Sequence, residues 1–310
     1  MGDNPDAVVA PPCTEEEFLA LGFETRGFAG HELISNKSKV QYFRSLFGTS
    51  PEVLAFVWQE LRHAKIESAK LDKYCKPIHL LLYYRWIRSY ETEFELRTQF
   101  NFGEETLRKW LRRMAKCVSS LRAIVIDPNW DEDDELIYIG GLDGVHYPTD
   151  EPRPFSKGNS SYKRGGKAAL AYEFVLSIHE NKIKWVNGGY PAGLGDREIF
   201  KEKGLLAAMK TKQAKLGRKV RLIADDGYTQ KDLYEYLSLR NEFDPRQVAY
   251  FKDRVLSRQE FFNGKTKNYR CLTTEFAHSH DLHQQVVESI CVTLQYEMDL
   301  GLLTLFDAYP

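Results

Sequence analysis

Three acidic residues, each in a different kind of local sequence, most constrain what this chain can be. Asp143 lies near the end of a short apolar run, residues 135–147, and Asp225 ends a similar run, residues 219–225. Glu260 lies in a segment with helical apolar spacing. Carboxylates at the ends of buried strands lose hydration and repel one another where they converge, so a cation is needed to neutralise them. The pattern therefore predicts a divalent metal site.

The spacing of apolar and turn residues predicts the elements around these acids. Two β-rich stretches follow the first acidic strand, with a turn expected at Glu180 and Asn181 between them. The expected elements are strands at 135–147, 169–179 and 182–187, a helix at 196–210, a strand at 219–225, a helix at 230–239, a strand at 247–251 and a helix at 256–269. The predicted order is β-β-β-α-β-α-β-α, with the acids on the first strand, the fourth strand and the last helix.

This order resembles the RNase H-like fold of the DDE transposases and retroviral integrases. Four segments narrow the resemblance to the PIF/Harbinger group of the IS5-like superfamily: GLDGVH, GLGDREIFKEKGL, LIADDGY and RVLSRQEFFNGKTKNYRCL. Each is similar to a motif of that group, and the four occur in the same order over roughly residues 85–305. The resemblance implies an α/β fold whose catalytic domain is RNase H-like, with a mixed sheet flanked by helices.

The family's site residues carry over position by position. In the family pattern the second aspartate stands three residues before a tyrosine, which selects Asp225 over Asp226 as the catalytic residue. The chain departs from the pattern at Gly195, where many relatives carry histidine, and at Gln259, next to the glutamate. Neither departure removes a carboxylate, so the resemblance implies that Asp143, Asp225 and Glu260 are both catalytic residues and metal ligands.

Two-metal phosphodiester chemistry explains why three carboxylates suffice. Two Mg²⁺ or Mn²⁺ ions, about 4 Å apart, can activate a nucleophile and stabilise the leaving oxygen, and such hard cations prefer oxygen ligands. On this interpretation Asp143 bridges both ions, Asp225 holds the first and Glu260 the second. The expected function is that of a transposase-derived DDE endonuclease, with hydrolysis and strand transfer of DNA phosphodiester bonds. The alternative is a domesticated, non-catalytic DNA- or protein-binding factor that keeps the fold.

Other polar residues near these motifs have two interpretations each. His146 either orients substrate or is a hydrogen-bonded strand residue, and Asp196 is either an N-cap of the following helix or a residue lining the site. Asp226 is expected in a turn, since Asp-Gly dipeptides favour turns. The histidines at 278, 280 and 283 are either a zinc site or a polar approach to the last helix, and the second is favoured because no cysteine or carboxylate pattern completes a zinc site.

The N-terminal half has helical spacing and a candidate helix-turn-helix. Helices are expected at residues 51–63 and 77–90, and then a short helix at 92–100, a turn with Gly103 and a basic helix from Glu104. The apolar residues expected to pack inward are Leu107, Trp110, Leu111 and Met114, and the cations expected to contact DNA are Arg108, Lys109, Arg112 and Arg113. A helical bundle that only braces the catalytic domain is the alternative.

Charge and sequence composition bear on DNA binding, on domain organisation, on membrane partners and on the state of the cysteines. The net charge of −1 leaves DNA binding to local basic patches, the second of which contains Lys163, Arg164 and Lys167, although a solvated charged face is the simpler alternative. The predicted parts are a mobile N-terminal segment (1–35), a helical, helix-turn-helix-like DNA-binding domain (36–130) and the nuclease domain (131–310). No apolar stretch reaches membrane-spanning length, so no membrane partner is expected. The five cysteines are scattered and are expected to be reduced and buried.

The resemblance also bears on partners and location. Beyond DNA, it implies a separate Myb-like DNA-binding partner and a nuclear location, with partner-assisted import from the cytoplasm. Joining two DNA ends requires at least a dimer, so a homo-oligomer is expected.

Overall fold

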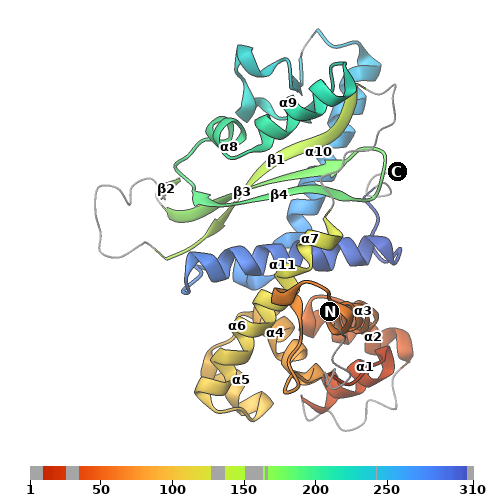
Figure 1. Ribbon diagram of the computed structural model, residues 1–310, viewed down its shortest axis with the longest axis vertical. Helices are drawn as coiled ribbons and strands as arrows, with labels where there is room; N and C mark the ends of the chain where they lie inside the picture. The colour runs from red at the N-terminus through yellow and green to blue at the C-terminus, as the bar shows by residue number, and fades with distance from the viewer. Residues whose placement is uncertain are drawn as a thin grey trace, which may run out of the picture. The chain divides into compact units, whose positions relative to one another are not determined.

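The computed structural model describes residues 10–25, 35–126, 137–150, 163–164, 167–241 and 243–305. The chain divides into two compact units (Figure 1). The helical unit consists of residues 1–125, 268–271 and 285–300, and the sheet unit of residues 126–267, 272–284 and 301–310. The helical unit thus takes in residues 285–300, which the sequence analysis assigned to the nuclease domain.

A mixed β-sheet organises the sheet unit. Its strands are β1 (Tyr138–Pro148), β2 (Lys163–Arg164), β3 (Lys167–Ser177), β4 (Ile183–Pro191), β5 (Arg221–Ala224) and β6 (Leu237–Leu239). The strand path is β2-β3-β1-β5-β6, and β4 also pairs with β3. The first strands pair antiparallel, whereas β5 runs parallel to both β1 and β6. The predicted mixed sheet is therefore confirmed.

Helices pack on both faces of this sheet. On one face, α8 (Asp196–Glu202) and α9 (Leu205–Leu216) bury Phe200 and Met209 against the strands (Figure 1). On the other face, α10 (Arg246–Thr266) packs Phe262 edge-on against Phe174 of β3. Because side chains alternate along a strand, neighbouring residues of β1 face different helices.

Two predicted elements of the sheet unit are wrong. Residues 230–239 are not a helix: they form a short 3-10 turn, Lys231–Leu233, and the strand β6. Residues 247–251 are not a strand, since α10 begins at Arg246 and continues through Glu260. A strand of three residues is too short to show a period of two, and the buried stripe of α10 is hard to recognise because it includes the polar residues Lys252, Gln259 and Asn263.

The helical unit is built from short helices joined by tight turns. They are α1 (Glu15–Glu24), α2 (Asn36–Phe47), α3 (Pro51–His63), α4 (Pro77–Ser89), α5 (Glu93–Phe100), α6 (Glu104–Ser120), α7 (Arg122–Val125) and the later part of α11 (His280–Asp299). The predicted helices at 51–63 and 77–90 are confirmed as α3 and α4. The five cysteines are free and buried, as expected. None of the helices in the described ranges is long and apolar enough to cross a membrane.

The helix α1 lies in the range predicted to be a mobile segment. Thr14 accepts a hydrogen bond from the Glu17 backbone N–H, and the Glu17 side chain accepts one from the Thr14 backbone. This capping box starts the helix, and Phe18 and Phe23 are buried. The range predicted to be mobile therefore contains a packed helix at residues 15–24, while residues 1–9 and 26–34 lie outside the described residues.

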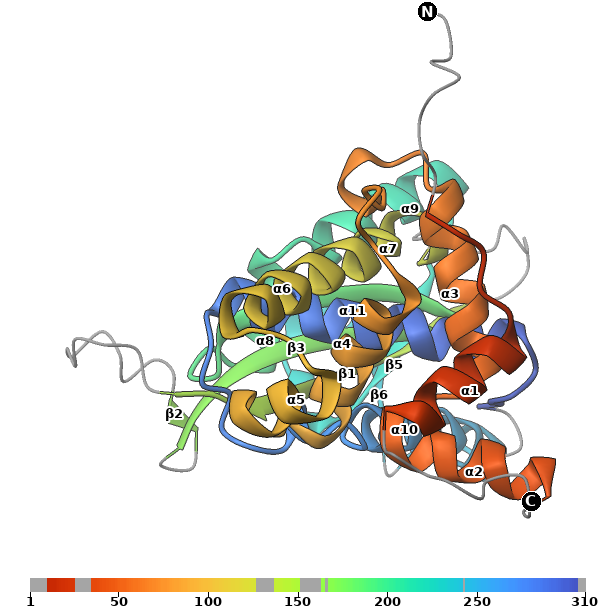
Figure 2. The ribbon, with the colours of Figure 1, turned by 90° about the horizontal axis from the view of Figure 1, so that it is seen from below.

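Polar contacts attach the later part of α11 to other helices of the helical unit, whose course Figure 2 shows. The Tyr84 hydroxyl of α4 lies 2.6 Å from Thr293 Oγ1, and Ser289 Oγ lies 3.3 Å from the Ala115 carbonyl oxygen of α6. Thr293 already donates to the Ser289 carbonyl, so Tyr84 is the donor in its pair with Thr293. Both residues are fully buried. The helical unit therefore depends on a segment from the far end of the chain.

Removing one partner of the buried Tyr84–Thr293 pair should destabilise the protein. We expect Thr293→Val to lower the free energy of unfolding by about 1–3 kcal/mol, because the Tyr84 hydroxyl is left buried without an acceptor. Urea unfolding of Thr293→Val, Tyr84→Phe and the double variant measures the coupling. The double variant should lose less than the sum of the single variants, and strict additivity would contradict the interaction.

Candidate active site

The register of two parallel strands brings Asp143 and Asp225 together. Leu142 of β1 pairs with Ala224 of β5, so the next residues along both strands are the two aspartates. β5 ends at Ala224, and Asp225 caps the following 3-10 turn through a 3.0 Å hydrogen bond from the Gly227 backbone N–H. The predicted pairing of these acids at strand ends is therefore present, although β1 itself continues to Pro148.

Asp143 is held in a fixed orientation by two donors. Its Oδ1 accepts a 2.8 Å hydrogen bond from the Gly144 backbone N–H, and its Oδ2 accepts a 2.7 Å bond from the Asn263 side chain of α10. One turn earlier, the buried Gln259 side chain donates to the Gly141 carbonyl oxygen. These contacts fix α10 against β1 and place the exposed Glu260 between the two anchoring residues.

Asp196 lies beside both aspartates. A Cβ added at Gly144 would be 2.7 Å from Asp196 Oδ1, and one added at Gly227 would be 3.1 Å from Asp196 Oδ2. The absence of side chains at these two glycines makes room for the Asp196 carboxylate. The helix N-cap is Gly195, so the expectation that Asp196 is the cap is wrong, and Asp196 lines the acidic site instead.

Burial and the neighbouring carboxylates raise the pKa of Asp143. Burial is the main cause, and the charge of Asp225 comes next, with smaller contributions from Asp196 and Glu260. The Gly144 hydrogen bond acts in the opposite direction, and the resulting pKa is about 7, compared with 3.8 for an ordinary aspartate. Bringing Asp143 to its ionised form therefore costs free energy that a nearby cation would offset.

The oxygen-only donor set suits Mg²⁺ or Mn²⁺, and the raised pKa of Asp143 fits a cation-binding role. Within the described residues, however, no three His, Cys, Asp or Glu side chains stand close enough together to hold a metal ion. The structure brings Asp143, Asp225, Asp196 and Glu260 within electrostatic reach of one another, and it does not show a closed coordination shell.

A fifth acid near this site, the buried Glu173, was not predicted from the sequence. It pairs with Gly144 across β3 and β1 and is 1% exposed. Burial, reinforced by the charge of Asp196, raises its pKa to about 8, while the neighbouring Tyr228 hydroxyl acts in the opposite direction. Its position in the middle of an apolar run, LAYEFVL, is the signal that could have identified it.

Two histidine predictions fall near this site. His146 is half-buried on β1, two residues beyond Gly144 and on the same side of the strand. His283 is buried, its Nδ1 lies 2.7 Å from the Tyr172 hydroxyl, and burial lowers its pKa to about 3. The contact of His283 with Tyr172 supports a structural role rather than a zinc site.

The predicted DNA-contacting cations of α6 differ in their surroundings. Arg108 forms ion pairs of 2.7 Å with both Glu93 and Glu104, and Arg113 donates to the Lys70 carbonyl oxygen. Lys109 and Arg112 are exposed, whereas the residues predicted to pack inward, Leu107, Trp110, Leu111 and Met114, are all buried. The side chains of Lys163 and Arg164 lie outside the described residues, and Lys167 is exposed at the start of β3.

Residues 142–295 match the family model described as DDE superfamily endonuclease. The match supports the DDE superfamily. It begins one residue before Asp143 and includes Asp225, Asp196 and Glu260, so all four acids of the site fall within the DDE region. Comparison with the curated proteins and with the solved structures found no match.

The buried carboxyl of Glu173 predicts a pH-dependent stability. Its pKa is higher in the folded chain than in the unfolded chain, so the folded state retains the proton between about pH 4.5 and 8. Stability should therefore fall as pH rises through this window, on the order of 1.4 kcal/mol per pH unit for one group. Glu173→Gln should lack this loss, which urea unfolding at pH 5.5 and 8.5 measures.

The exposed Glu202→Gln, at the end of α8, is the matched control for Glu173→Gln. We expect its stability to follow the wild type at both pH values. If Glu173→Gln also followed the wild type, the raised pKa of the buried carboxyl would be wrong.

Proposed function

We propose that this protein is a metal-dependent DNA endonuclease that cleaves phosphodiester bonds and transfers the resulting strand end, as a transposase-derived enzyme of the PIF/Harbinger type. The observation that carries the proposal is that Asp143 and Asp225 follow paired residues of two parallel strands inside the DDE region, with Glu260 within electrostatic reach of Asp143. The raised pKa of Asp143 supports a site that works with a cation.

In this proposal Asp143, Asp225 and Glu260 hold Mg²⁺ or Mn²⁺. Divalent ions of this kind stabilise charge on the attacking and leaving oxygens of a phosphodiester. Asn263 and the Gly144 N–H orient the Asp143 carboxylate, and Gln259 secures the helix that carries Glu260. Asp196 lines the same site from α8 and adds negative charge there.

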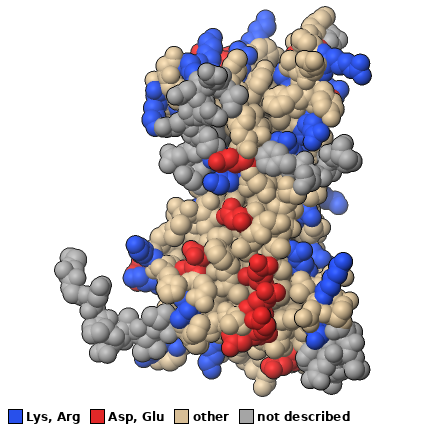
Figure 3. All heavy atoms as spheres, turned by 90° about the vertical axis from the view of Figure 1, so that its right-hand side faces the viewer, with Lys and Arg blue, Asp and Glu red and all other residues tan. Residues whose placement is uncertain are grey.

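The helical unit supplies the proposed DNA contacts. Arg112 and Lys109 are exposed on α6, which follows α5 after the turn at Asn101 (Figure 2). Another face of this unit is acidic. Burial, followed by the charge of the nearby Glu52 of α3, raises the pKa of Glu15 of α1, and Figure 3 shows a band of acidic side chains over that side. DNA should avoid the acidic face, so α6 is the better candidate.

The proposal includes the further features that the family resemblance implies. They are a homo-oligomer that brings two DNA ends together, a separate Myb-like partner and a nuclear location. Lys163, Arg164 and Lys167 would add a second set of phosphate contacts beside the catalytic strand.

Loss of Asp225 should abolish DNA cleavage. With Mg²⁺ or Mn²⁺ we expect the wild type to nick supercoiled plasmid and to cut duplexes carrying candidate element ends, and we expect EDTA to stop both reactions. Asp225→Asn should lower the rate at least about 100-fold, because it removes one charge from the cation site. Gel analysis of nicked and linear DNA gives the rates.

Asp232→Asn is the matched control for the cleavage assay. Asp232 is an exposed carboxylate of the same unit, and its surface ion pair with Lys201 contributes little to stability. Its cleavage rate should equal that of the wild type. Equal DNA binding without metal-dependent cleavage, in both wild type and Asp225→Asn, would favour a non-catalytic binding factor.

Arg112 and Arg108 of α6 should contribute unequally to DNA affinity. Arg112→Ala should weaken DNA binding and lower the slope of log K against log salt by about 0.9, as expected for one lost phosphate contact. Arg108→Ala removes the same charge from a residue already paired with Glu93 and Glu104, so its slope should change much less. Fluorescence anisotropy at several salt concentrations tests this, and equal slopes would contradict the assignment.

A further inference from the structure

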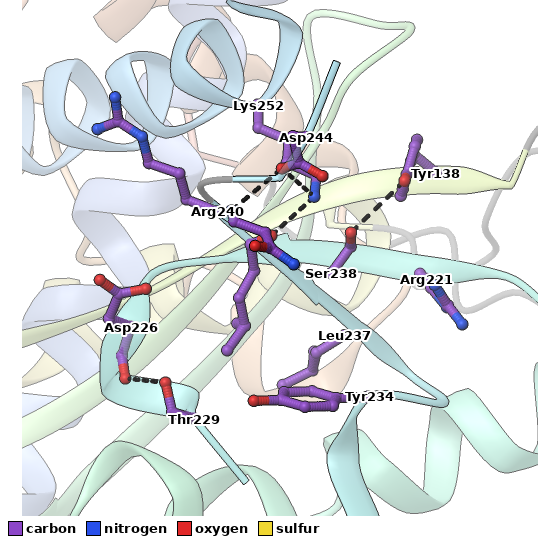
Figure 4. A pocket seen from close by; sticks show the side chains of 12 residues that line it. Tyr138, Arg221, Asp226, Thr229, Tyr234, Leu237, Ser238, Arg240, Asp244 and Lys252 are labelled. Atoms are coloured by element: carbon purple, nitrogen blue, oxygen red, sulfur yellow. Dashed lines mark hydrogen bonds and ion pairs between the residues drawn. The ribbon is translucent and has the colours of Figure 1, made fainter. Parts of the chain in front are cut away.

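A polar cavity of about 550 Å³ lies in the sheet unit beside β5 and β6 (Figure 4). This volume is in the range of small-ligand sites, so it takes a single nucleotide but not a DNA duplex. Tyr138 and Arg221 lie on one side of the cavity in this view, and Asp226 and Thr229 on the other.

One wall of the cavity is a rigid polar network. Lys252 of α10 is 3% exposed, and its ammonium donates hydrogen bonds of 2.7 Å to the Leu239 carbonyl oxygen and 2.8 Å to Asp244. The ion pair between the buried Lys252 and the half-buried Asp244, together with the bond to Leu239, holds the end of β6 against α10. The cavity is therefore a preformed feature of the fold and not a gap between loose side chains.

Arg221 offers a hydrogen-bond donor beside this wall. Its Nε is buried and has no hydrogen-bond partner among the described residues. Buried polar groups are normally paired, so an unpaired guanidinium N–H in a polar cavity indicates a ligand with acceptor oxygens or nitrogens. Phosphate groups and the edges of nucleobases both provide such acceptors.

Aromatic and hydroxyl groups complete the lining. The Tyr234 side chain is 43% exposed, which leaves part of its surface open for contact with a ligand. Ser238 Oγ lies 3.5 Å from the Tyr138 hydroxyl on another side of the cavity. Aromatic rings stack on bases of any sequence, and hydroxyl groups can bond to their edges.

The cavity is next to the proposed cleavage site. Asp226, which lines it, directly follows Asp225, and Thr229 Oγ1 donates a 2.7 Å hydrogen bond to the Asp226 carbonyl oxygen. The same short turn therefore holds a catalytic acid and one side of the cavity. A strand whose phosphodiester reaches Asp225 has its neighbouring nucleotides close to this cavity.

We propose that this cavity holds one unpaired nucleotide of the DNA strand being cut, with its base against Tyr234 and an acceptor group on Arg221. The inference rests on the proposed function, because it uses the position of the strand at Asp225. It adds a binding step, in which one nucleotide leaves the duplex at the cost of unstacking and unpairing it.

Binding to three labelled duplexes of otherwise identical sequence tests the proposal. One duplex is fully paired, one carries a single unpaired nucleotide and one carries an abasic unit at that position. The full-length protein is titrated in EDTA with fluorescence anisotropy as the readout. We expect the duplex with the unpaired nucleotide to bind roughly tenfold more tightly than the other two, as for one stacked base.

Variants of the cavity separate recognition of the base from general DNA affinity. Tyr234→Ala and Arg221→Gln should lose the tenfold preference and keep the wild-type affinity for the paired duplex. Tyr234→Phe should keep the preference because it retains the ring. Tyr250→Ala, an exposed tyrosine on α10 that does not line the cavity, should behave as the wild type. Thermal unfolding confirms that each variant is folded.

Three results would overturn the proposal. The first is equal affinity for the paired duplex and the duplex with the unpaired nucleotide. The second is binding of the abasic duplex as tightly as the duplex with the unpaired nucleotide. The third is an undiminished preference for the unpaired nucleotide in folded Tyr234→Ala and Arg221→Gln. Adenosine monophosphate is the competitor that identifies the source of the nucleotide: it should reduce only the preference for the unpaired nucleotide. Binding of adenosine monophosphate without any such preference would assign the cavity to free nucleotides. Because EDTA stops cleavage, the binding preference and the cleavage reaction can fail independently.

Discussion

The burial of Asp143 beside other carboxylates is the constraint on which the rest of the site depends. Burial and the charges of Asp225, Asp196 and Glu260 together bring the pKa of Asp143 to about 7. A fold that places acids this way needs donors that hold them in position, and the Gly144 N–H and Asn263 provide them for Asp143. The remaining negative charge is what makes the site suited to a divalent cation.

The helix α10 links this site to the neighbouring cavity. Asn263 and Gln259 attach this helix to β1. Lys252, two turns before Gln259, attaches it to the end of β6. Polar residues at buried positions of one helix therefore set the position of Glu260 and form the wall of the cavity. These side chains are retained in the interior because each has a hydrogen-bond partner on the sheet or on the segment that follows it.

Local motifs indicate the candidate acids, but not the residues that surround them. Asp143, Asp225 and Glu260 are candidates from short sequence patterns, and the mixed sheet is implied by the family resemblance that these patterns carry. Asn263 and Glu173 depend on contacts between segments far apart in the chain, which have no signature in the local sequence. For the same reason the contribution of α11 to the helical unit was not foreseen: Thr293 meets Tyr84, 209 residues away. The short β6 and the partly polar buried face of α10 hid the true elements at residues 230–251.

Binding of Mn²⁺ to the protein without DNA tests the central claim most directly. Electron paramagnetic resonance of free Mn²⁺ at pH 8, where Asp143 is mostly ionised, gives the affinity of wild type and of Asp143→Asn. The account predicts saturable binding by the wild type, at least about tenfold weaker binding by the variant, and weaker binding by the wild type at pH 6, because protons compete for Asp143. Equal Mn²⁺ affinity of the two proteins at pH 8 would contradict it.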